Sequence, residues 1–213
     1  MRRALLTLSF AMLIACSERT SGGSQADELT AALNAYYADN PECVRVGDPA
    51  DEAGVIAEIM QADVELDRRV PRLEALADVG LLEVRVADVK VETFWESDPT
   101  TAAARQYVLT DDGRGALQPA EKASRGRRSA TVFCYGHRQV AAIETATEPA
   151  DALGVRTVNV RYAYELADVP GWARGARMAD AFPKIASAVE GLQEGSAELV
   201  LTDRGWVRSS AAP

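Results

Sequence analysis

Few residues in this chain could carry out nucleophilic chemistry. It has three cysteines, Cys16, Cys43 and Cys134, and a single histidine, His137. A thiol three residues from an imidazole suggests a cysteine–histidine pair, in which the imidazole removes the thiol proton and the thiolate attacks a substrate. A disulfide at Cys134 would remove that nucleophile. We favour this second interpretation, in which His137 is a surface residue of a Gly136-His137 turn.

Motifs for metals, phosphates and covalent catalysis are missing from the sequence. One histidine and dispersed cysteines do not make a zinc site, and Asp111-Asp112 is too short for a calcium loop and lacks its terminal glutamate. There is no glycine-rich phosphate loop, no G-x-S-x-G elbow and no S-x-x-K motif. We therefore expect no metal, no cofactor and no catalytic residue. A hydrolase that assembles carboxylates from distant segments is the alternative.

The N-terminus is the most informative segment. Met1-Arg2-Arg3 is positively charged, and Ala4–Ala15 is an apolar run that is shorter than the roughly 20 residues needed to cross a bilayer. This pattern is typical of a signal peptide at residues 1–15. The end of the run, Leu13-Ile14-Ala15-Cys16, resembles the bacterial lipobox. The resemblance implies a diacylglyceryl group on the Cys16 sulfur, cleavage before Cys16 and acylation of the new amino group.

An acylated Cys16 would hold the protein on a membrane, because each buried methylene of an acyl chain contributes about 0.8 kcal/mol. In well-studied Gram-negative systems an aspartate after the lipidated cysteine retains the protein in the inner membrane. Ser17 stands there instead, so we expect an outer-membrane lipoprotein facing the periplasm, with the inner membrane as the alternative. Residues 16–26 are mostly small and polar and are expected to form a flexible tether.

The charge and the remaining cysteines agree with export. The formal net charge is −9, and removing Arg2 and Arg3 with the signal peptide makes it more negative. Nucleic-acid affinity is largely electrostatic, so nucleic acid is a poor partner. Cys43 and Cys134 are left as two thiols in an oxidising compartment, which suggests one disulfide between them.

The first half of the chain resembles a winged-helix domain. Apolar spacing predicts helices over Asp27–Tyr37, Ala50–Leu66 and Pro71–Ala77, and then strands over Leu81–Phe94 and Arg105–Thr110. The stretches RLEALADVGLLEVR and RQYVLTDDGRGAL resemble a recognition helix entering a wing and the strand returning from it. The resemblance implies a helical part with a two-stranded wing over 27–122. The charges of 63–79 nearly cancel, so a DNA-binding regulator is less favoured.

The second half, residues 130–209, is β-rich. A basic stretch at Glu121–Ser129 marks the boundary between the two halves. We expect an antiparallel sheet with one covering helix, which makes the whole chain α+β. Its expected elements are strands at Thr131–Tyr135, Arg138–Thr147 and Val155–Leu166, a helix at Asp180–Leu192, and a hairpin of Ala197–Thr202 with Trp206–Arg208.

Aromatic residues concentrate in this second half and define a candidate binding groove of Tyr162, Tyr164, Trp172 and Trp206. Such residues could line a groove for a peptide, a glycan or a lipid. More often, such residues form the core of a small sheet packed on a helix. The function that we expect is non-catalytic: a membrane-anchored periplasmic lipoprotein that binds a protein or another envelope component. The alternative is a hydrolase that acts on envelope material.

The lipobox makes a direct prediction. The N-terminal peptide of the protein isolated from cell envelopes should begin at Cys16 and carry three acyl chains, as mass spectrometry would show. The variant Cys16→Ala should lose all three chains and its firm membrane attachment, because no sulfur is left to accept the diacylglyceryl group. An unmodified Cys16 thiol on a chain that keeps residues 1–15 would contradict the prediction.

Overall fold

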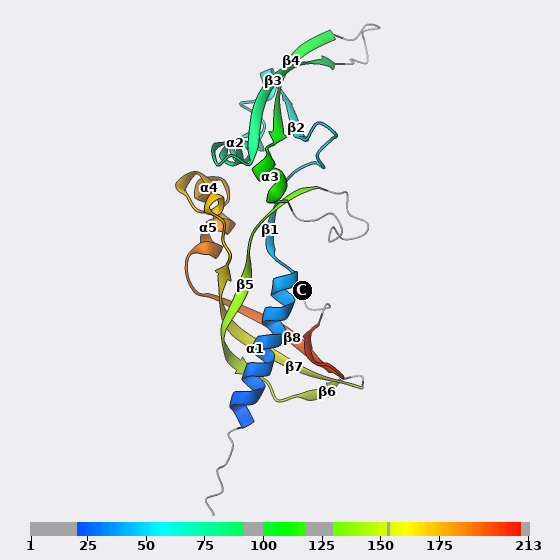
Figure 1. Ribbon diagram of the computed structural model, residues 1–213, viewed down its shortest axis with the longest axis vertical. Helices are drawn as coiled ribbons and strands as arrows, with labels where there is room; N and C mark the ends of the chain where they lie inside the picture. Colours follow the sequence, from blue (N-terminus) through cyan, green and yellow to red (C-terminus); the bar gives the residue numbers. More distant parts are fainter. Residues whose placement is uncertain (1–20, 92–99, 118–129, 153, 210–213) are drawn as a thin grey trace, which may run out of the picture.

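Two antiparallel sheets and short helices make up the protein. The computed structural model describes residues 21–91, 100–117, 130–152 and 154–209. In Figure 1 the smaller sheet lies at one end of an elongated molecule and the larger sheet at the other, with strand β5 running between them. The segment that resembles a lipobox with Cys16, the predicted signal peptide and the basic stretch Glu121–Ser129 lie outside the described residues.

The larger sheet is a curled antiparallel half-barrel. Its strand order is β1-β5-β7-β8-β9, and β6 pairs with one end of β7. Register shifts between Val140 and Ala142 and between Ile143 and Thr145 interrupt the β5–β7 ladder, and such irregularities bend a strand and increase its twist. The strands are β1 (Glu42–Gly47), β5 (Thr131–Ala146), β6 (Ala150–Ala152), β7 (Val155–Ala167), β8 (Gln193–Thr202) and β9 (Gly205–Arg208).

Helix α1 (Ser21–Asp39) covers one face of this half-barrel. Leu29, Leu33 and Tyr37 recur at intervals of four residues on one side of the helix and are buried. They pack against side chains of β5, β7 and β8, namely Val140, Val158, Val160, Tyr162, Ala197 and Leu199. The helix begins at Ser21, within the segment 16–26 that we expected to be a tether.

The smaller sheet has three strands in the order β2-β4-β3. The strands are β2 (Val55–Met60), β3 (Leu82–Val91) and β4 (Thr100–Leu109), with the 3-10 turn η1 (Gln61–Asp63) and helix α2 (Val70–Asp78) between β2 and β3. Pro71 lies in the first turn of α2, and Leu73, Ala75 and Leu76 are the buried residues of this helix. The short helix α3 (Asp111–Gly115) follows β4 and is capped by Thr110, whose hydroxyl accepts a hydrogen bond from the Gly113 amide.

The expected α+β class with a helical, winged-helix-like N-terminal part is wrong, because the protein is mostly β. The error lies in the segment Ala50–Leu66, whose apolar spacing fits a helix face. Its residues 55–60 instead form β2, which pairs with β4. Val55, Ile56 and Ile59 are β-branched and favour a strand. Leu66, which we placed on the helix face, is 80% exposed. The hairpin of β3 and β4 itself does occur near the positions expected for a wing.

The helical segment of the C-terminal half is divided, where we expected it to be continuous. The turn η3 (Gly171–Ala173) is followed by α4 (Ala176–Ala181) and α5 (Pro183–Val189), where we predicted a single helix from Asp180 to Leu192. Pro183 separates the two helices, because proline has no amide hydrogen for the helix and restricts the residue before it. Met178, Phe182 and Ile185 of this segment are buried against α2 and the smaller sheet, in a core that also includes Phe133 of β5.

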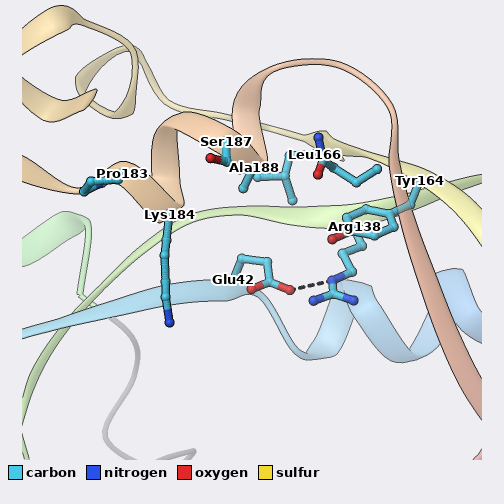
Figure 2. Close-up of a pocket in the computed structure, with 9 residues that line it drawn as sticks. Glu42, Arg138, Tyr164, Leu166, Pro183, Lys184, Ser187 and Ala188 are labelled. Atoms are coloured by element: carbon cyan, nitrogen blue, oxygen red, sulfur yellow. Dashed lines mark hydrogen bonds and ion pairs between the residues drawn. The ribbon is translucent and has the colours of Figure 1, made fainter. Parts of the chain in front are cut away.

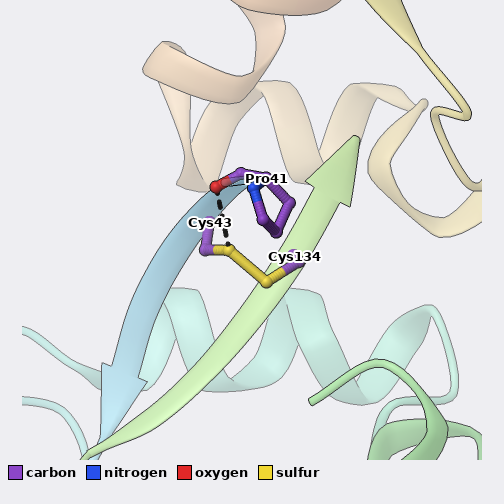
Figure 3. Close-up of a disulfide and its surroundings, with 3 residues drawn as sticks. All are labelled: Pro41, Cys43 and Cys134. Carbon is purple, nitrogen blue, oxygen red and sulfur yellow. Dashed lines mark hydrogen bonds between the residues drawn. A yellow bond between two sulfur atoms is a disulfide. The ribbon is translucent and has the colours of Figure 1, made fainter. Parts of the chain in front are cut away.

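Strand β1 joins the two halves of the sequence, because it pairs with β5 rather than with its neighbours in the first half. Cys43 lies opposite Cys134 in this ladder, and their sulfurs form a disulfide, as Figure 3 shows. The predicted disulfide is thereby confirmed. We grouped residues 27–47 with the helical part at 27–122. They instead form most of helix α1, which packs on the larger sheet, and strand β1, which belongs to it.

Strand β5 runs without a break through the Gly136-His137 pair that we expected to form a turn. Gly136 has φ +137, a conformation that other residues rarely adopt. A Cβ at this position would lie 2.8 Å from the carbonyl oxygen of Ala167 on β7. The glycine thus lets β5 bend while it stays close to its neighbour.

The disulfide should contribute strongly to stability. It links residues 91 positions apart, and a loop of this length is worth about 4–5 kcal/mol in the chain-entropy treatment. We expect the double variant Cys43→Ser/Cys134→Ser to lose a free energy of unfolding of this order in urea titrations. The reduced wild-type protein is the matched control and should lose a similar amount. Unchanged stability in both would contradict the expectation.

Candidate functional site

A charged pair lies where β1 and β5 meet below α5. The Arg138 Nε donates a hydrogen bond to Oε1 of Glu42 over 2.6 Å, and the two side chains are 27% and 28% exposed. The guanidinium also lies over two aromatic rings, with its Cζ 4.5 Å from the ring centroid of Tyr164 and 5.2 Å from that of Tyr37. Arg138 is thus held by a carboxylate and by two rings (Figure 2, which shows Glu42, Arg138 and Tyr164).

A pair of tyrosines connects this charged pair to α1. The hydroxyls of Tyr37 on α1 and Tyr162 on β7 are hydrogen-bonded to each other, and the Arg138 Nη1 lies 3.5 Å from the Tyr162 hydroxyl. Tyr162 is fully buried, and β8 makes room for its ring with Gly195, where a Cβ would lie 2.5 Å from the ring. The tyrosines lock α1 onto the sheet next to Arg138.

The electrostatic state of these groups follows from their surroundings. Burial, and then the hydrogen bond with Tyr162, raises the pKa of Tyr37 to about 12. For Arg138, burial alone would lower the pKa, but the Glu42 carboxylate and the Tyr162 hydroxyl outweigh this and raise it. Arg138 therefore stays charged and Tyr37 stays neutral at physiological pH. Their arrangement supplies a fixed positive charge rather than a proton donor.

A cavity of about 380 Å³ opens beside Arg138, and we call it the polar pocket. Glu42 and Arg138 form one wall and Tyr164 lies next to them. Residues of α5 form the other wall, where Lys184 and Ser187 are exposed. In Figure 2 the Lys184 side chain extends away from Ser187, so the two do not form a lysine-activated serine.

A second cavity of about 480 Å³ adjoins the first, and we call it the apolar pocket. The two share Pro183 and Lys184. The remaining lining of the apolar pocket comes from β1, α2, β5 and the start of α5, namely Cys43, Val44, Arg72, Tyr135, Phe182 and Ile185. The start of α5 thus lies between the polar pocket and the apolar pocket.

The structure brings together two of the four aromatic residues of the predicted groove. Tyr162 and Tyr164 lie on β7 with ring centroids 5.9 Å apart, and Tyr164 lines the polar pocket. Trp172 packs against Phe133 at 6.3 Å in the core beside the smaller sheet. Trp206 packs with the core below α1. The four residues therefore do not line one groove, and Tyr162 belongs to the core.

The cysteine–histidine pair does not form, because the Cys134 sulfur is bonded to Cys43. The His137 Nδ1 lies 3.5 Å from the Asp168 carboxylate instead. Within the part of the chain that the structure describes, no group of three or more histidine, cysteine, aspartate or glutamate residues could hold a metal ion.

Four charged residues that shape the two pockets were not predicted from the sequence, namely Glu42, Arg72, Arg138 and Lys184. Lys184 carried a signal, since the chain has only three lysines and this one follows Phe182-Pro183. Arg138 carried a weaker one, because it begins the predicted strand Arg138–Thr147, two residues before the apolar Val140. Glu42 and Arg72 have no such signal in the sequence, because they line the pockets only through the packing of distant segments.

A comparison of the chain with protein-family models and with solved structures found no match. In the segments that the structure describes, no helix has both the length and the apolar content needed to cross a membrane.

The raised pKa of Tyr37 predicts a loss of stability at alkaline pH. Below the ordinary tyrosine pKa of about 10 the residue is neutral in both states, so its contribution is complete. As the pH rises towards 12 the unfolded chain releases this proton while the folded chain retains it, and stability falls by about 2 kcal/mol. Urea titrations at about pH 9 and about pH 11.5 would measure this loss.

The variant Tyr37→Phe should lose stability at neutral pH, because the Tyr162 hydroxyl loses its partner, and should show a smaller alkaline loss. Tyr36→Phe is the matched control, since it keeps the hydrogen bond between Tyr37 and Tyr162 and should retain the wild-type alkaline loss. Identical pH profiles for Tyr37→Phe and the wild type would refute the assignment.

Proposed function

We propose that this protein is an outer-membrane lipoprotein, anchored by acyl chains on Cys16, that binds a ligand in the two adjoining pockets and does not transform it. The observation that carries the proposal is the pair of cavities that share Pro183 and Lys184. Each has a volume in the range of ligand sites, which runs from about 300 to 1,000 Å³. Binding, rather than catalysis, is what their side chains favour.

The charges of the polar pocket support a non-catalytic role. A general acid or base must be placed to exchange a proton with the substrate. The Glu42 carboxylate instead accepts a hydrogen bond in an ion pair with Arg138, whose pKa is raised. The pocket beside α2 and α4 contains two carboxylates, Glu74 and Asp180. Glu74 accepts hydrogen bonds from Arg105 and Tyr107, and Asp180 is exposed. Neither pocket resembles the close pair of buried carboxylates that a hydrolase would need.

The disulfide supports the proposed periplasmic location. Disulfides persist in the periplasm and are rare in the bacterial cytosol. The Cys43–Cys134 bond links the first and fifth strands, so the fold itself is suited to an oxidising compartment. This agrees with the lipobox and with the negative net charge, which disfavours nucleic acid as a partner.

Site-specific crosslinking in living cells tests the binding role. A photoreactive amino acid at Ser187, which is exposed and lines the polar pocket, should yield adducts with the ligand or partner. Glu165 is the matched control position, because it is exposed on β7 between Tyr164 and Leu166 and therefore faces the other side of the sheet. Adducts at both positions alike, or at neither, would refute the proposed site.

A further inference from the structure

The apolar pocket is asymmetric in a way that indicates the chemistry of its ligand. Its interior is formed by Val44, Phe182 and Ile185, of which Phe182 is 4% and Ile185 1% exposed. Two cationic side chains, Arg72 of α2 and Lys184 of α5, line the same cavity and are exposed. An apolar hollow with positive charges at its solvent side suits a molecule with an apolar chain and a negative end.

These two cations are not neutralised by the protein. Among the described residues, neither Arg72 nor Lys184 has a carboxylate within ion-pair distance, and the Arg72 guanidinium lies over the Phe182 ring at 5.7 Å. Three acids near them are already engaged. Glu42 pairs with Arg138, and the other two, which lie on α2, pair with arginines of other elements, Glu74 with Arg105 of β4 and Asp78 with Arg177 of α4. In a chain of net charge −9, two unpaired cations at one cavity are available for an anion.

Tyr135 provides a second, independent observation. Its side chain is only 7% exposed and lines the apolar pocket. Burial, and then the Glu42 carboxylate, raises the pKa of Tyr135, so its hydroxyl stays a neutral hydrogen-bond donor. Among the residues that the structure describes, none forms a hydrogen bond with this hydroxyl, and Arg208 Nε is the one buried side-chain nitrogen or oxygen without a partner. The Tyr135 hydroxyl is therefore accessible and can donate a hydrogen bond to a ligand oxygen.

We propose that the apolar pocket binds a single-chain anionic amphiphile. The acyl chain would lie against Val44, Phe182 and Ile185, and a carboxylate or phosphate head would lie between Arg72 and Lys184. Guanidinium groups bind such oxyanions with two parallel hydrogen bonds, and a lysine adds a point charge. This inference rests on the proposed binding function and specifies its ligand. A fatty acid and a lysophospholipid share this chemistry.

Photoaffinity labelling of the full chain in isolated cell envelopes tests the proposal. Four probes carry the same long diazirine-bearing alkyl chain and differ in the head, which is a carboxylate, a phosphate monoester, an alcohol or a trimethylammonium group. We expect the two anionic probes to label peptides containing Tyr135 and residues 182–185 about tenfold more than the cationic probe, as charge complementarity at the mouth requires. The ratio of labelling by the carboxylate probe to labelling by the phosphate probe distinguishes a fatty acid from a lysophospholipid as the ligand.

Matched charge reversals give the control. Lys184→Glu should reduce labelling by the anionic probes about tenfold, because it replaces an attractive charge by a repulsive one. Lys90→Glu makes the same change on exposed β3, away from both pockets, and should leave labelling unchanged. Recovery of the Cys43–Cys134 disulfide in both variants verifies folding. Equal labelling by the anionic and cationic probes, or equal effects of the two variants, would overturn the proposal.

The crosslinks at Ser187 distinguish this inference from the proposed function. Capture of a polypeptide at Ser187, together with no preference for anionic probes, would show that the pockets bind but that the ligand class is wrong. No capture at Ser187 and no labelling of residues 182–185 would overturn both.

Discussion

The pairing of β1 with β5 is the constraint on which the rest of the structure depends. It places Cys43 opposite Cys134 and brings Glu42 to the bend of β5 at Gly136, within reach of Arg138. It also fixes α1, because only Asn40 and Pro41 separate the end of that helix from β1. Helix, charged pair and apolar pocket are therefore all set by one short ladder between segments that are distant in the sequence.

The parts of the fold that sequence reasoning predicted are those whose residues satisfy a single pattern. Strand β7 alternates polar and apolar residues, and only an extended chain gives that period. Residues 55–60 satisfy two patterns, since Val55 and Ile59 fit one side of a helix as well as a buried strand. The pairing of β2 with β4 decides between them, and this long-range contact leaves no local mark. The turn predicted at Gly136 was wrong for a similar reason, because a glycine is as compatible with a bend inside a strand as with a turn.

The candidate site was less predictable than the fold. Its central contacts join Glu42 to Arg138 and Tyr37 to Tyr162, across 96 and 125 positions of the chain. None of these four residues is unusual in its local sequence. The site forms only when the fold brings the four side chains into contact. The aromatic concentration in the second half pointed to the right strand through Tyr164. It could not separate a residue that lines a pocket from one that fills the core, such as Tyr162.

The position of β1 has a consequence for how the chain acquires its structure. Synthesis begins at the N-terminus, so α1 and β1 emerge well before β5, β7 and β8, the strands against which they pack. Contacts between such distant segments form late and make folding slow. The apolar side of α1 and the thiol of Cys43 therefore stay exposed until more than 90 further residues have been synthesised. A chaperone that covers this apolar side, and an oxidant that joins the two thiols, would therefore favour correct folding.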